Sequence, residues 1–507
     1  MSPAACLMVQ GTASSVGKSL LAAALCRIFA RAGYRVAPFK SQNMALNAAV
    51  TLEGGEIGRA QAAQAAAAGV EATIDMNPIL LKPEPAHRSQ VVVRGCPIGS
   101  LTWPEYQRMQ AELLPIVTES LARLRRAFDL VIIEGAGSPA EINLRDSDIV
   151  NMRVARMAEA PVLLVGDIDR GGVFAALLGT LALLDAPDRA RVGGLIVNRF
   201  RGDEAVLTPG LVELAARAGV PVLGVVPYLE PGLVPSEDSL DLDDRSRWGA
   251  PGALDVAVVR LPLISNFDDF EPLAAEPGVR VRFVRGADGL DGADLIVLPG
   301  SKSTVSDLRW LFASGLALAI RQAAADGRPV LGVCGGYQML GEAVRDPDRI
   351  ESDAIVSEGL GLLSSVTTFA PGKTTVRVRA QVGRASPLFA AAAESELTAY
   401  EIHYGRTSAG SPAPFTIVER RGEPAHDADG AVSASGAVVG TYLHGLLAND
   451  AVRRALLVYL AERKGIAADP RWGAPAADRY ERLADAVARA VDVAAVAKLA
   501  GLSFPRS

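Results

Sequence analysis

The sequence has few of the residues that build zinc centres and disulfide frameworks. Its 507 residues include 4 cysteines and 4 histidines, and no two cysteines stand in a C-x-x-C spacing. Neither a disulfide framework nor a zinc site is expected from this usage, and a reducing cytoplasm fits it. Aromatic residues make up only 5% of the chain, which we attribute to genome composition rather than to function.

The chain also lacks a strong excess of charge and a long apolar run. Its formal net charge of −6 gives no reason to expect a general affinity for nucleic acid or for an acidic membrane. No uninterrupted apolar run approaches the ~18 residues that span a bilayer. No basic stretch precedes "CLMVQGT", so no secretory signal is predicted. We expect a cytoplasmic protein without nucleic-acid partners or membrane insertion, and the sequence does not predict its oligomeric state.

Strand–loop–helix units fill the first half of the chain. Short apolar runs such as "FDLVIIEGAGS" and "APVLLVGDIDRGG" end in Gly, Asp or Glu and precede stretches with helical character. Continuous apolar strands of this kind are typical of a parallel sheet covered on both faces. Residues 1–230 are therefore predicted to form one doubly wound α/β domain.

A change of composition separates this domain from a second one. Residues 231–252 are acidic and rich in Pro and Gly, which predicts a linker. A second α/β series, including "ADLIVLPGSKST" and "RPVLGVCGGYQML", predicts another doubly wound domain over residues 253–450. Residues 451–507 have a helical pattern and are expected to pack on that second domain.

The stretch "QGTASSVGKSLLAAAL" resembles a phosphate-binding loop with one extra residue. Gly11 is separated from Gly17-Lys18-Ser19 by five residues, where a Walker A loop has four. The loop still joins an apolar strand to a helix, whose N-terminal N–H groups favour bound phosphate. Lys18 can reach the β- and γ-phosphates of a nucleotide, and the Ser19 hydroxyl can ligate Mg²⁺.

Two further residues are expected beside this loop. Glu134 ends the strand of "DLVIIEGAGS" and could supply an acid for the metal, because ligands of open α/β sheets bind at the carboxyl ends of strands. The pattern G-T-x-S/T-x-V-G-K-S/T resembles the dethiobiotin synthetase family, which activates carboxylates with ATP. That resemblance implies a lysine near the phosphates at Lys40. The implied ATP-binding residues are Thr12, Gly17, Lys18, Ser19 and Lys40.

Cys334 stands on a predicted strand-to-helix turn. In "RPVLGVCGGYQML" it follows an apolar strand and is flanked by Gly332, Gly335 and Gly336. This is the arrangement of a nucleophile elbow, with G-x-C-x-G in place of G-x-S-x-G. The helix N-terminus and a nearby base would favour the reactive thiolate, so Cys334 is the candidate nucleophile.

Histidine is the usual base for such a thiol. His444, in "AVVGTYLHGLL", ends an apolar strand of the same predicted domain and is the first candidate. His403, in "YEIHYG", is the second candidate. His426 lies in a polar stretch predicted to be a loop, and His87 belongs to the first domain.

Together, "GVCGGYQML" and "GTYLHG" resemble the class I glutamine amidotransferase domain. The resemblance implies that Cys334 attacks the glutamine amide and that His444 is its base. It also implies an oxyanion hole at "LPGSKST", with Gly300, Ser301 and Gly335 contributing. Many members carry His-Pro-Glu, whose Glu orients the histidine, whereas this chain has His444-Gly445-Leu446. The site is therefore expected to be a dyad, or to use another group to orient His444.

Further segments resemble the family of cobyric acid synthases, which form amides in cobalamin biosynthesis. These are "FKSQNMALN", "EIGRAQAAQA", "VGDIDRGGVFA", "LIVNRFRGD", "SEDSLDLD", "ISNFDDFEPL", "LPGSKST" and "YEIHYG". The resemblance implies ATP- and glutamine-dependent amidation of a corrinoid with Mg²⁺ at the phosphates, at carboxylates b, d, e and g of adenosylcobyrinic acid a,c-diamide. Glu56 is a further candidate Mg²⁺ ligand beside Ser19 and Glu134. Candidates for the substrate side are Gln42, Asn43 and Asn47, and Asp167 and Asp169 could hold metal or orient the substrate.

Two alternatives stay open at this point. One is glutamine-dependent amidation of another polycarboxylate, such as the substrate of the related cobyrinic acid a,c-diamide synthases or a cell-wall precursor. The segment Lys40-Ser41-Gln42-Asn43 argues against that related family, which typically has K-x-G-P-D-Y-I-D there. The other alternative is a partitioning-type P-loop ATPase, which would leave the elbow at Cys334 unexplained.

Overall fold

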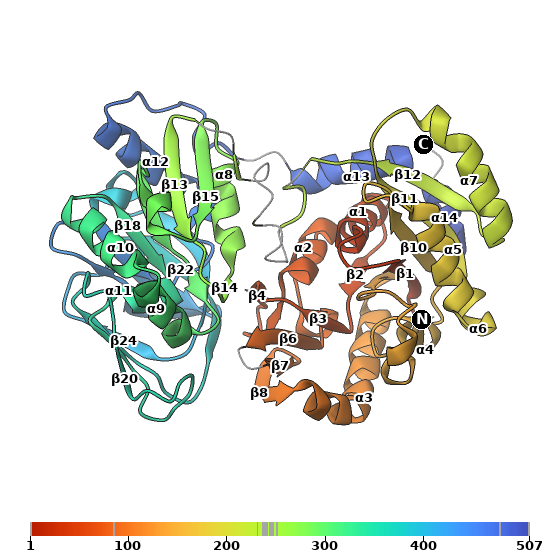
Figure 1. Ribbon diagram of the computed structural model, residues 1–507, viewed down its shortest axis with the longest axis horizontal. Helices are drawn as coiled ribbons and strands as arrows, with labels where there is room; N and C mark the ends of the chain where they lie inside the picture. Colours follow the sequence, from red (N-terminus) through yellow and green to blue (C-terminus); the bar gives the residue numbers. More distant parts are fainter. Residues whose placement is uncertain are drawn as a thin grey trace. The chain divides into compact units, whose positions relative to one another are not determined.

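The structure is a computed structural model that describes residues 3–84, 87–230, 232–235, 242, 248–249, 252–475 and 478–504. The chain divides into two compact units (Figure 1). The first unit comprises residues 1–45, 57–235 and 477–507, and the second comprises residues 46–56 and 236–476. Most of the predicted linker 231–252 lies outside the described residues.

A six-stranded parallel sheet forms the centre of the first unit. Its strand order is β12-β11-β10-β1-β9-β2. The apolar runs of the sequence form these strands because both faces of each are covered; all five residues of β9, LVIIE, are buried. The predicted doubly wound α/β class is confirmed for this unit. The strands are β1 (Ala5–Gly11), β2 (Val36–Phe39), β9 (Leu130–Glu134), β10 (Val162–Asp167), β11 (Val192–Phe200) and β12 (Val222–Pro227).

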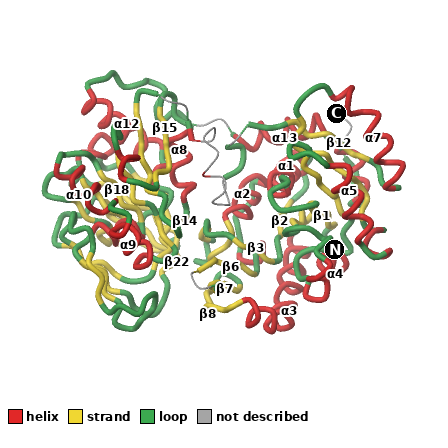
Figure 2. The backbone as a smooth tube through the Cα atoms, viewed as in Figure 1, coloured by secondary structure: helices red, strands yellow, loops and turns green. Residues whose placement is uncertain are grey.

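Helices accompany this sheet, and the yellow strands lie among red helices in Figure 2. The long helix α3 begins with a capping box, in which Thr102 and Glu105 bond each other's backbone N–H groups. The helices are α1 (Lys18–Arg31), α2 (Arg59–Ala68), α3 (Trp103–Ala127), α4 (Met152–Ala158), α5 (Val173–Leu183), α6 (Ala186–Arg189), α7 (Glu204–Ala218), α13 (Arg479–Ala490) and α14 (Val493–Leu499). No helix within the described ranges is both long and apolar enough to cross a membrane.

The end of the chain does not pack on the second domain as one piece. Helix α12 (Asp450–Lys464) lies in the second unit, whereas α13 and α14 lie in the first. Leu483 and Val487 of α13 share a buried cluster with Leu25 and Phe29 of α1. The sequence shows that α13 has an apolar face, but not which surface covers it. The expectation for the tail is therefore wrong for α13 and α14.

A small second sheet of the first unit was not predicted. Its order is β3-β6-β7-β8, with β3 parallel to β6 and the other neighbours antiparallel. The strands are β3 (Gln42–Met44), β6 (Ile79–Glu84), β7 (Arg88–Val93) and β8 (Cys96–Thr102). This sheet places Gln42 and Asn43 on a regular strand directly after Lys40.

The second unit is built on another six-stranded sheet, in the order β15-β13-β16-β18-β28-β27. It is parallel except for the edge strand β27. The strands are β13 (Leu254–Val259), β15 (Val279–Val284), β16 (Leu295–Leu298), β18 (Val330–Val333), β27 (Ala431–Val432) and β28 (Val438–Thr441). The helices, besides α12, are α8 (Glu271–Ala274), α9 (Thr304–Ala313), α10 (Leu316–Ala325) and α11 (Gly335–Leu340).

Smaller sheets complete the second unit. An antiparallel sheet has the order β23-β22-β25-β26, with β22 (Thr374–Val382), β23 (Glu396–His403), β25 (Phe415–Arg420) and β26 (Glu423–Asp429). His426 therefore lies on a strand and not in the predicted loop. The other strands are β14 (Ile264–Ser265), β17 (Gly300–Ser301), β19 (Ala343–Arg345), β20 (Val356–Glu358), β21 (Ser365–Thr368) and β24 (Arg406–Ala409).

The predicted domain boundary at residue 230 does not account for a short N-terminal segment that belongs to the second unit. The chain leaves the first unit after residue 45 and returns to it at residue 57, so residues 46–56 are part of the second unit. Strand β4 (Ala48–Val50) lies in this segment, and β5 (Glu56–Gly58) begins at its end. Strands this short have no readable hydrophobic period, so no pattern in the sequence predicts the exchange.

Candidate active sites

The phosphate-binding loop of the first unit has the backbone that its sequence predicts. It follows β1, and α1 begins at Lys18 with Gly17 as its N-cap. Gly17 has φ +101°, and a Cβ there would lie 2.0 Å from Asn198 Nδ2, so only glycine fits. The Asn198 amide also donates to the Val16 carbonyl at 2.8 Å. Sequence reasoning missed Asn198, although it follows an apolar run in "LIVNRF".

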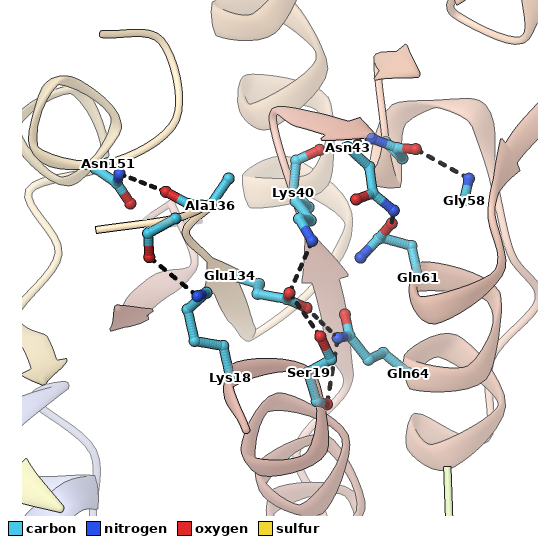
Figure 3. A network of polar contacts seen from close by, with 12 residues as sticks. Lys18, Ser19, Lys40, Asn43, Gly58, Gln61, Gln64, Glu134, Ala136 and Asn151 are labelled. Atoms are coloured by element: carbon cyan, nitrogen blue, oxygen red, sulfur yellow. Dashed lines mark hydrogen bonds and ion pairs between the residues drawn. The ribbon is translucent and has the colours of Figure 1, made fainter. Parts of the chain in front are cut away.

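Glu134 lies at the centre of a polar network at the start of α1 (Figure 3). Its carboxylate accepts hydrogen bonds from Ser19 Oγ at 2.8 Å and from Gln64 Nε2 at 2.5 Å, and pairs with Lys40 Nζ at 2.8 Å. Glu134 is only 1% exposed. Burial favours the neutral acid, but Lys40, Gln64 and Ser19 together hold the pKa of Glu134 below its ordinary value. The predicted residues Ser19, Lys40 and Glu134 thus lie together around an ionised carboxylate.

The ammonium group of Lys18 points towards the segment that follows β9, near Ala136 (Figure 3). Its Nζ donates to the Ala13 carbonyl at 2.8 Å and to the Gly137 carbonyl at 3.0 Å. The Thr12 N–H donates to the Val165 carbonyl at 2.9 Å, which fixes the first turn of the loop to β10. Lys18 is therefore held at the carboxyl edge of the sheet, where a phosphate would meet it.

The oxygen atoms present here suit magnesium. Mg²⁺ prefers one or two carboxylate or hydroxyl oxygens together with water and phosphate oxygens. Ser19 Oγ and the Glu134 carboxylate, 2.8 Å apart, offer such a pair. Across the part of the chain that the structure describes, no cluster of three His, Cys, Asp or Glu residues could hold a metal by itself. The site therefore fits a metal held jointly with nucleotide phosphates.

A second amide layer extends this network. Asn43 Nδ2 donates to Gln61 Oε1 at 3.0 Å, and Gln61 and Gln64 stand three residues apart on one face of α2. This i, i+3 spacing in an otherwise Ala-rich helix was the available signal for Gln61 and Gln64, which sequence reasoning missed. Gln42 accepts a hydrogen bond from the Tyr106 hydroxyl.

The remaining substrate and metal candidates have polar partners outside this network. Asn47 and Glu56 belong to the second unit, where Glu56 Oε2 pairs with Lys373 Nζ at 2.6 Å. Asp167 ends β10, and its carboxylate contacts Arg199 Nη1 at 2.9 Å. Asp169 Oδ1 lies 3.2 Å from Arg201 Nε. The metal role of Glu56 and the substrate roles of Asn47, Asp167 and Asp169 stay predictions.

In the second unit, Cys334 sits on the sharp turn between β18 and α11. Its backbone has φ +54° and ψ −109°, a strained geometry for a residue with a side chain. A Cβ at Gly336 would lie 2.0 Å from the Leu298 carbonyl oxygen, so the turn can form only with glycine there. The Cys334 thiol donates to the Ile402 carbonyl of β23 at 3.3 Å. This is the elbow that the G-x-C-x-G pattern predicts.

His444 is oriented by an aspartate that sequence reasoning did not find. His444 Nδ1 lies 2.6 Å from Asp269 Oδ2, and the Gly445 N–H donates to Asp269 Oδ1 at 2.9 Å. Asp269 lies on a short 3-10 helix, Phe267–Phe270, in "ISNFDDFEPL". The only signal in the sequence was an acidic residue between buried phenylalanines shortly after β14. His444 thus contacts both Asp269 and Cys334, and the three side chains are a candidate triad with Asp269 in the place of the expected glutamate.

Charge stabilises the protonated form of His444. Burial lowers the pKa of the imidazole, but Asp269 and Cys334 outweigh it and raise the pKa of His444 from 6.5 to about 10. An imidazolium in this position can act as a general acid towards a leaving group. His403, the other candidate base, has a side chain that is 8% exposed and stacks on Tyr442 with ring centroids 3.7 Å apart. The geometry therefore favours His444.

The predicted oxyanion residues gather beside this triad. Gly335 starts α11, and a Cβ there would lie 3.0 Å from Ser301 N. A Cβ at Gly300 would lie 3.1 Å from His444 Cε1. Ser301 Oγ donates to the buried Asp307 at 2.7 Å, which fixes the loop. Backbone N–H groups at Ser301 and Gly335 are thus brought close to the turn that carries the thiol.

Comparison with known proteins places both sites in one family. Residues 7–232 match a family described as a CobQ/CobB/MinD/ParA nucleotide binding domain, and residues 255–452 match a CobB/CobQ-like glutamine amidotransferase domain. A cobyric acid synthase of Sorangium cellulosum is 57% identical over 98% of this chain and 98% of its own length. The chain belongs to the cobyric acid synthase family. The cobyric acid synthases of Pelotomaculum thermopropionicum and Moorella thermoacetica are each 49% identical, covering 99% and 98% of this chain and 97% and 98% of their own lengths.

Membership of the cobyric acid synthase family confirms the predicted pairing of a nucleotide-binding domain with a glutamine amidotransferase domain. It does not favour the two alternatives left open by the sequence. The relatives that match along nearly their full length are cobyric acid synthases, and neither a diamide synthase nor a partitioning ATPase is among these relatives.

We expect Asp269→Asn to lower kcat for glutamine hydrolysis by about 10² to 10⁴-fold. An asparagine side chain can keep the shape of the contact, but it lacks the charge that stabilises the His444 imidazolium and can favour the wrong tautomer. Release of glutamate from glutamine by the purified chain measures the effect. Asp268→Asn, one residue away, is the matched control. A variant of Asp269 with wild-type kcat would contradict the triad.

The same ion pair predicts a pH-dependent difference in stability. The pKa of His444 is raised in the folded chain from 6.5 to about 10, so this contribution is complete below pH 6.5 and is lost as pH rises towards 10. The stability deficit of Asp269→Asn should therefore be larger at pH 6 than at pH 10. Urea unfolding midpoints of both chains at the two pH values provide the comparison, and an equal deficit would count against the assigned charge state.

Proposed function

We propose that this chain converts adenosylcobyrinic acid a,c-diamide into adenosylcobyric acid by amidating carboxylates b, d, e and g. It is an ATP- and glutamine-dependent amide ligase of cobalamin biosynthesis. The observation that carries the proposal is 57% identity to a cobyric acid synthase along 98% of both chains. The two sites divide the chemistry between the release of ammonia and the activation of the carboxylate.

The second unit supplies ammonia. The Cys334 thiolate attacks the side-chain amide carbon of glutamine, and the developing oxyanion is met by N–H groups at Ser301 and Gly335. His444 delivers a proton to the leaving nitrogen as the C–N bond breaks, leaving a glutamyl thioester and ammonia. Asp269 keeps the imidazole oriented through its 2.6 Å contact with Nδ1. Water then attacks the thioester with His444 as base and releases glutamate.

The first unit activates the carboxylate. The γ-phosphoryl group of ATP moves to a carboxylate oxygen of the corrinoid, ADP leaves, and ammonia then displaces phosphate to form the amide. The loop from Thr12 to Gly17 and the cations Lys18 and Lys40 hold the phosphates. Mg²⁺ bound between Ser19, Glu134 and the phosphates would offset their charge. Gln42 and Asn43 lie at the start of the neighbouring sheet and would orient the substrate carboxylate.

The small-molecule partners follow from this reaction: a corrinoid, ATP and glutamine. The formal net charge of −6 supports the absence of a nucleic-acid partner. A reducing cytoplasm fits the free cysteines Cys6, Cys26, Cys96 and Cys334.

Mass spectrometry of the corrinoid tests this proposal. The purified chain is incubated with adenosylcobyrinic acid a,c-diamide, ATP, Mg²⁺ and glutamine. We expect four successive replacements of a carboxylate OH by NH₂, each requiring ATP. An unchanged corrinoid, or one that stops after a single amidation under saturating conditions, would contradict the assigned substrate. Cobyrinic acid, which lacks the a and c amides, serves as the comparison substrate for the diamide synthase reaction.

A further inference from the structure

Residues 46–56 belong to the amidotransferase unit although they lie within the nucleotide-binding family match. That match covers residues 7–232, yet the segment is part of the second unit. We refer to residues 46–56 as the docked segment. A piece of the nucleotide-binding sequence is therefore part of the unit that carries the proposed site of glutamine hydrolysis.

Side chains among the described residues of the second unit hold the docked segment, and three of them are Asn266, Arg377 and Lys373. Asn266 Nδ2 donates to the Ala48 carbonyl at 3.1 Å, and Arg377 Nε donates to the Val50 carbonyl at 2.7 Å. Lys373 Nζ pairs with Glu56 Oε2 at 2.6 Å, and the Lys373 and Glu56 side chains are 7% and 0% exposed. A buried ion pair gains little net stability, because desolvation offsets its attraction, but its geometry is demanding. These contacts therefore fix the position of the segment more than they stabilise the fold.

One of these side chains leads directly to the catalytic histidine. Asn266 Nδ2 also lies 2.9 Å from the Tyr400 hydroxyl. The Tyr400 ring stacks on the His444 imidazole, with centroids 5.2 Å apart and planes 15° apart. The two residues also exchange backbone hydrogen bonds, from Tyr400 N to His444 O at 3.1 Å and from His444 N to Tyr400 O at 2.9 Å. A displacement of Asn266 would thus shift the Tyr400 side chain, which contacts His444 directly.

The same residues also border the other members of the triad. Asn266 adopts φ +53° and forms the N-terminal cap of the 3-10 helix that carries Asp269, whose N–H donates to the Asn266 carbonyl at 3.1 Å. Tyr400 shares strand β23 with Ile402, whose carbonyl accepts the Cys334 thiol. Arg377 is the cross-strand partner of Tyr400 on β22. Asn266 and Arg377, which bind the docked segment, are therefore direct neighbours of residues that contact the triad.

Both ends of the docked segment continue into the phosphate-site network of the first unit. Asn43, three residues before Leu46, bonds Gln61. Just after Glu56, α2 carries Gln64, which donates to Glu134. Movement of Asn43, Gln61 or Gln64 on binding of ATP or a carboxylate would be transmitted along the peptide chain into the segment.

We propose that the docked segment couples the two reactions, and that Asn266 and Tyr400 are positioning residues that transmit its position to His444. This inference rests on the proposed function. Glutamine hydrolysis reaches its full rate only when the segment is held on Asn266 and Arg377, and binding of ATP and the corrinoid favours this held position. Loss of the link should lower kcat for glutamine hydrolysis and leave KM for glutamine unchanged, because the positioned group is the base and not a glutamine-binding residue.

Three variants test this inference in the full chain: Asn266→Ala, Tyr400→Phe and Arg377→Ala. Tyr400→Phe removes the hydroxyl and keeps the ring that stacks on His444. Arg379→Ala is the matched control, because Arg379 lies on the same strand but pairs with Glu396 and Glu419 at the surface. Glutamate release is measured with and without ATP plus the corrinoid diamide, and amidation from added ammonium is measured in parallel.

We expect ATP and corrinoid to stimulate glutamine hydrolysis by the wild-type chain and by Arg379→Ala about tenfold or more, which corresponds to a coupling of ordinary size. In the three test variants this stimulation should fall at least about fivefold, with KM for glutamine and ammonium-dependent amidation within about twofold of wild type. In the double variant of Asn266→Ala with Tyr400→Phe, the stimulation should be no lower than in the more affected single variant. The reason is that both substitutions break the same contact between Asn266 and Tyr400.

Wild-type stimulation in all three variants would overturn the coupling role. An equal loss of glutamine-dependent and ammonium-dependent amidation would also overturn it, because it would show a purely structural contribution. The proposed function fails separately: if the wild-type chain hydrolyses glutamine but leaves the corrinoid unchanged, the substrate assignment is wrong. If the wild-type chain amidates the corrinoid while the three variants behave as wild type, only the coupling is wrong.

Discussion

Replacing Cys334 by alanine is expected to abolish amidation from glutamine and to spare amidation from added ammonium. The Cys334 thiol is the nucleophile of the proposed glutamine hydrolysis, and loss of a nucleophile of this kind costs about 10⁴-fold or more in kcat. The strained elbow should keep its shape, since alanine has the same Cβ and the surrounding glycines are unchanged. The synthetase network around Glu134 lies in the other unit and should be unaffected.

The measurement is the formation of amidated corrinoid from each nitrogen source under otherwise equal conditions. Cys96→Ala provides the matched control, because Cys96 is a free cysteine that is exposed at the start of β8. It should retain both activities. Loss of ammonium-dependent amidation in Cys334→Ala, or retention of glutamine-dependent amidation, would show that the chemistry is not divided between the two units as described.

The second large effect is expected at the phosphate loop. Lys18→Ala should lower amidation from both nitrogen sources by about 10² to 10³-fold, the usual cost of removing one group that stabilises developing charge. Lys18 Nζ is held at 2.8 Å from the Ala13 carbonyl and 3.0 Å from the Gly137 carbonyl, which positions the cation at the phosphate loop. Basal glutamine hydrolysis without ATP should persist, because the triad needs no residue of this loop.

Lys498→Ala, on α14 of the same unit, is the control for charge removal at an exposed site. Initial rates with glutamine and with ammonium, together with basal glutamate release, separate the two halves of the reaction. Full activity of Lys18→Ala from either nitrogen source would refute the phosphate role. If Lys18→Ala also lost basal glutamine hydrolysis, Lys18 would support the whole fold and not the transfer of phosphate.

Local patterns were sufficient to predict the phosphate loop of the first unit and the cysteine elbow of the second. Gly17-Lys18-Ser19 joins a strand to a helix, and Glu134 ends a neighbouring strand. Because the carboxyl ends of parallel strands meet at one edge, these residues could be brought together without knowing the strand order. The elbow at Cys334 was readable for a similar reason, since glycines on both sides of a cysteine mark a turn too tight for other side chains.

Asp269 and the docked segment could not be found in this way. Asp269 lies 175 residues from His444 in sequence, and nothing in "NFDDF" distinguishes a triad carboxylate from a helix-capping one. The absence of the expected glutamate after His444 showed that an orienting group was needed, but not where it would come from. Residues 46–56 and helices α13 and α14 depend on which surface receives a short strand or an apolar helix face. That choice is set by tertiary packing and not by local periodicity.

The most direct test of the account follows nitrogen from one unit to the product of the other. The chain is incubated with the corrinoid diamide, ATP and glutamine labelled with ¹⁵N in its side-chain amide, in the presence of unlabelled ammonium at a concentration well below saturation. Mass spectrometry should show four added amides that carry the label in wild type, and no labelled product in Cys334→Ala. Added amides that are unlabelled in wild type, or a corrinoid that stays a diamide while glutamine is consumed, would contradict the account.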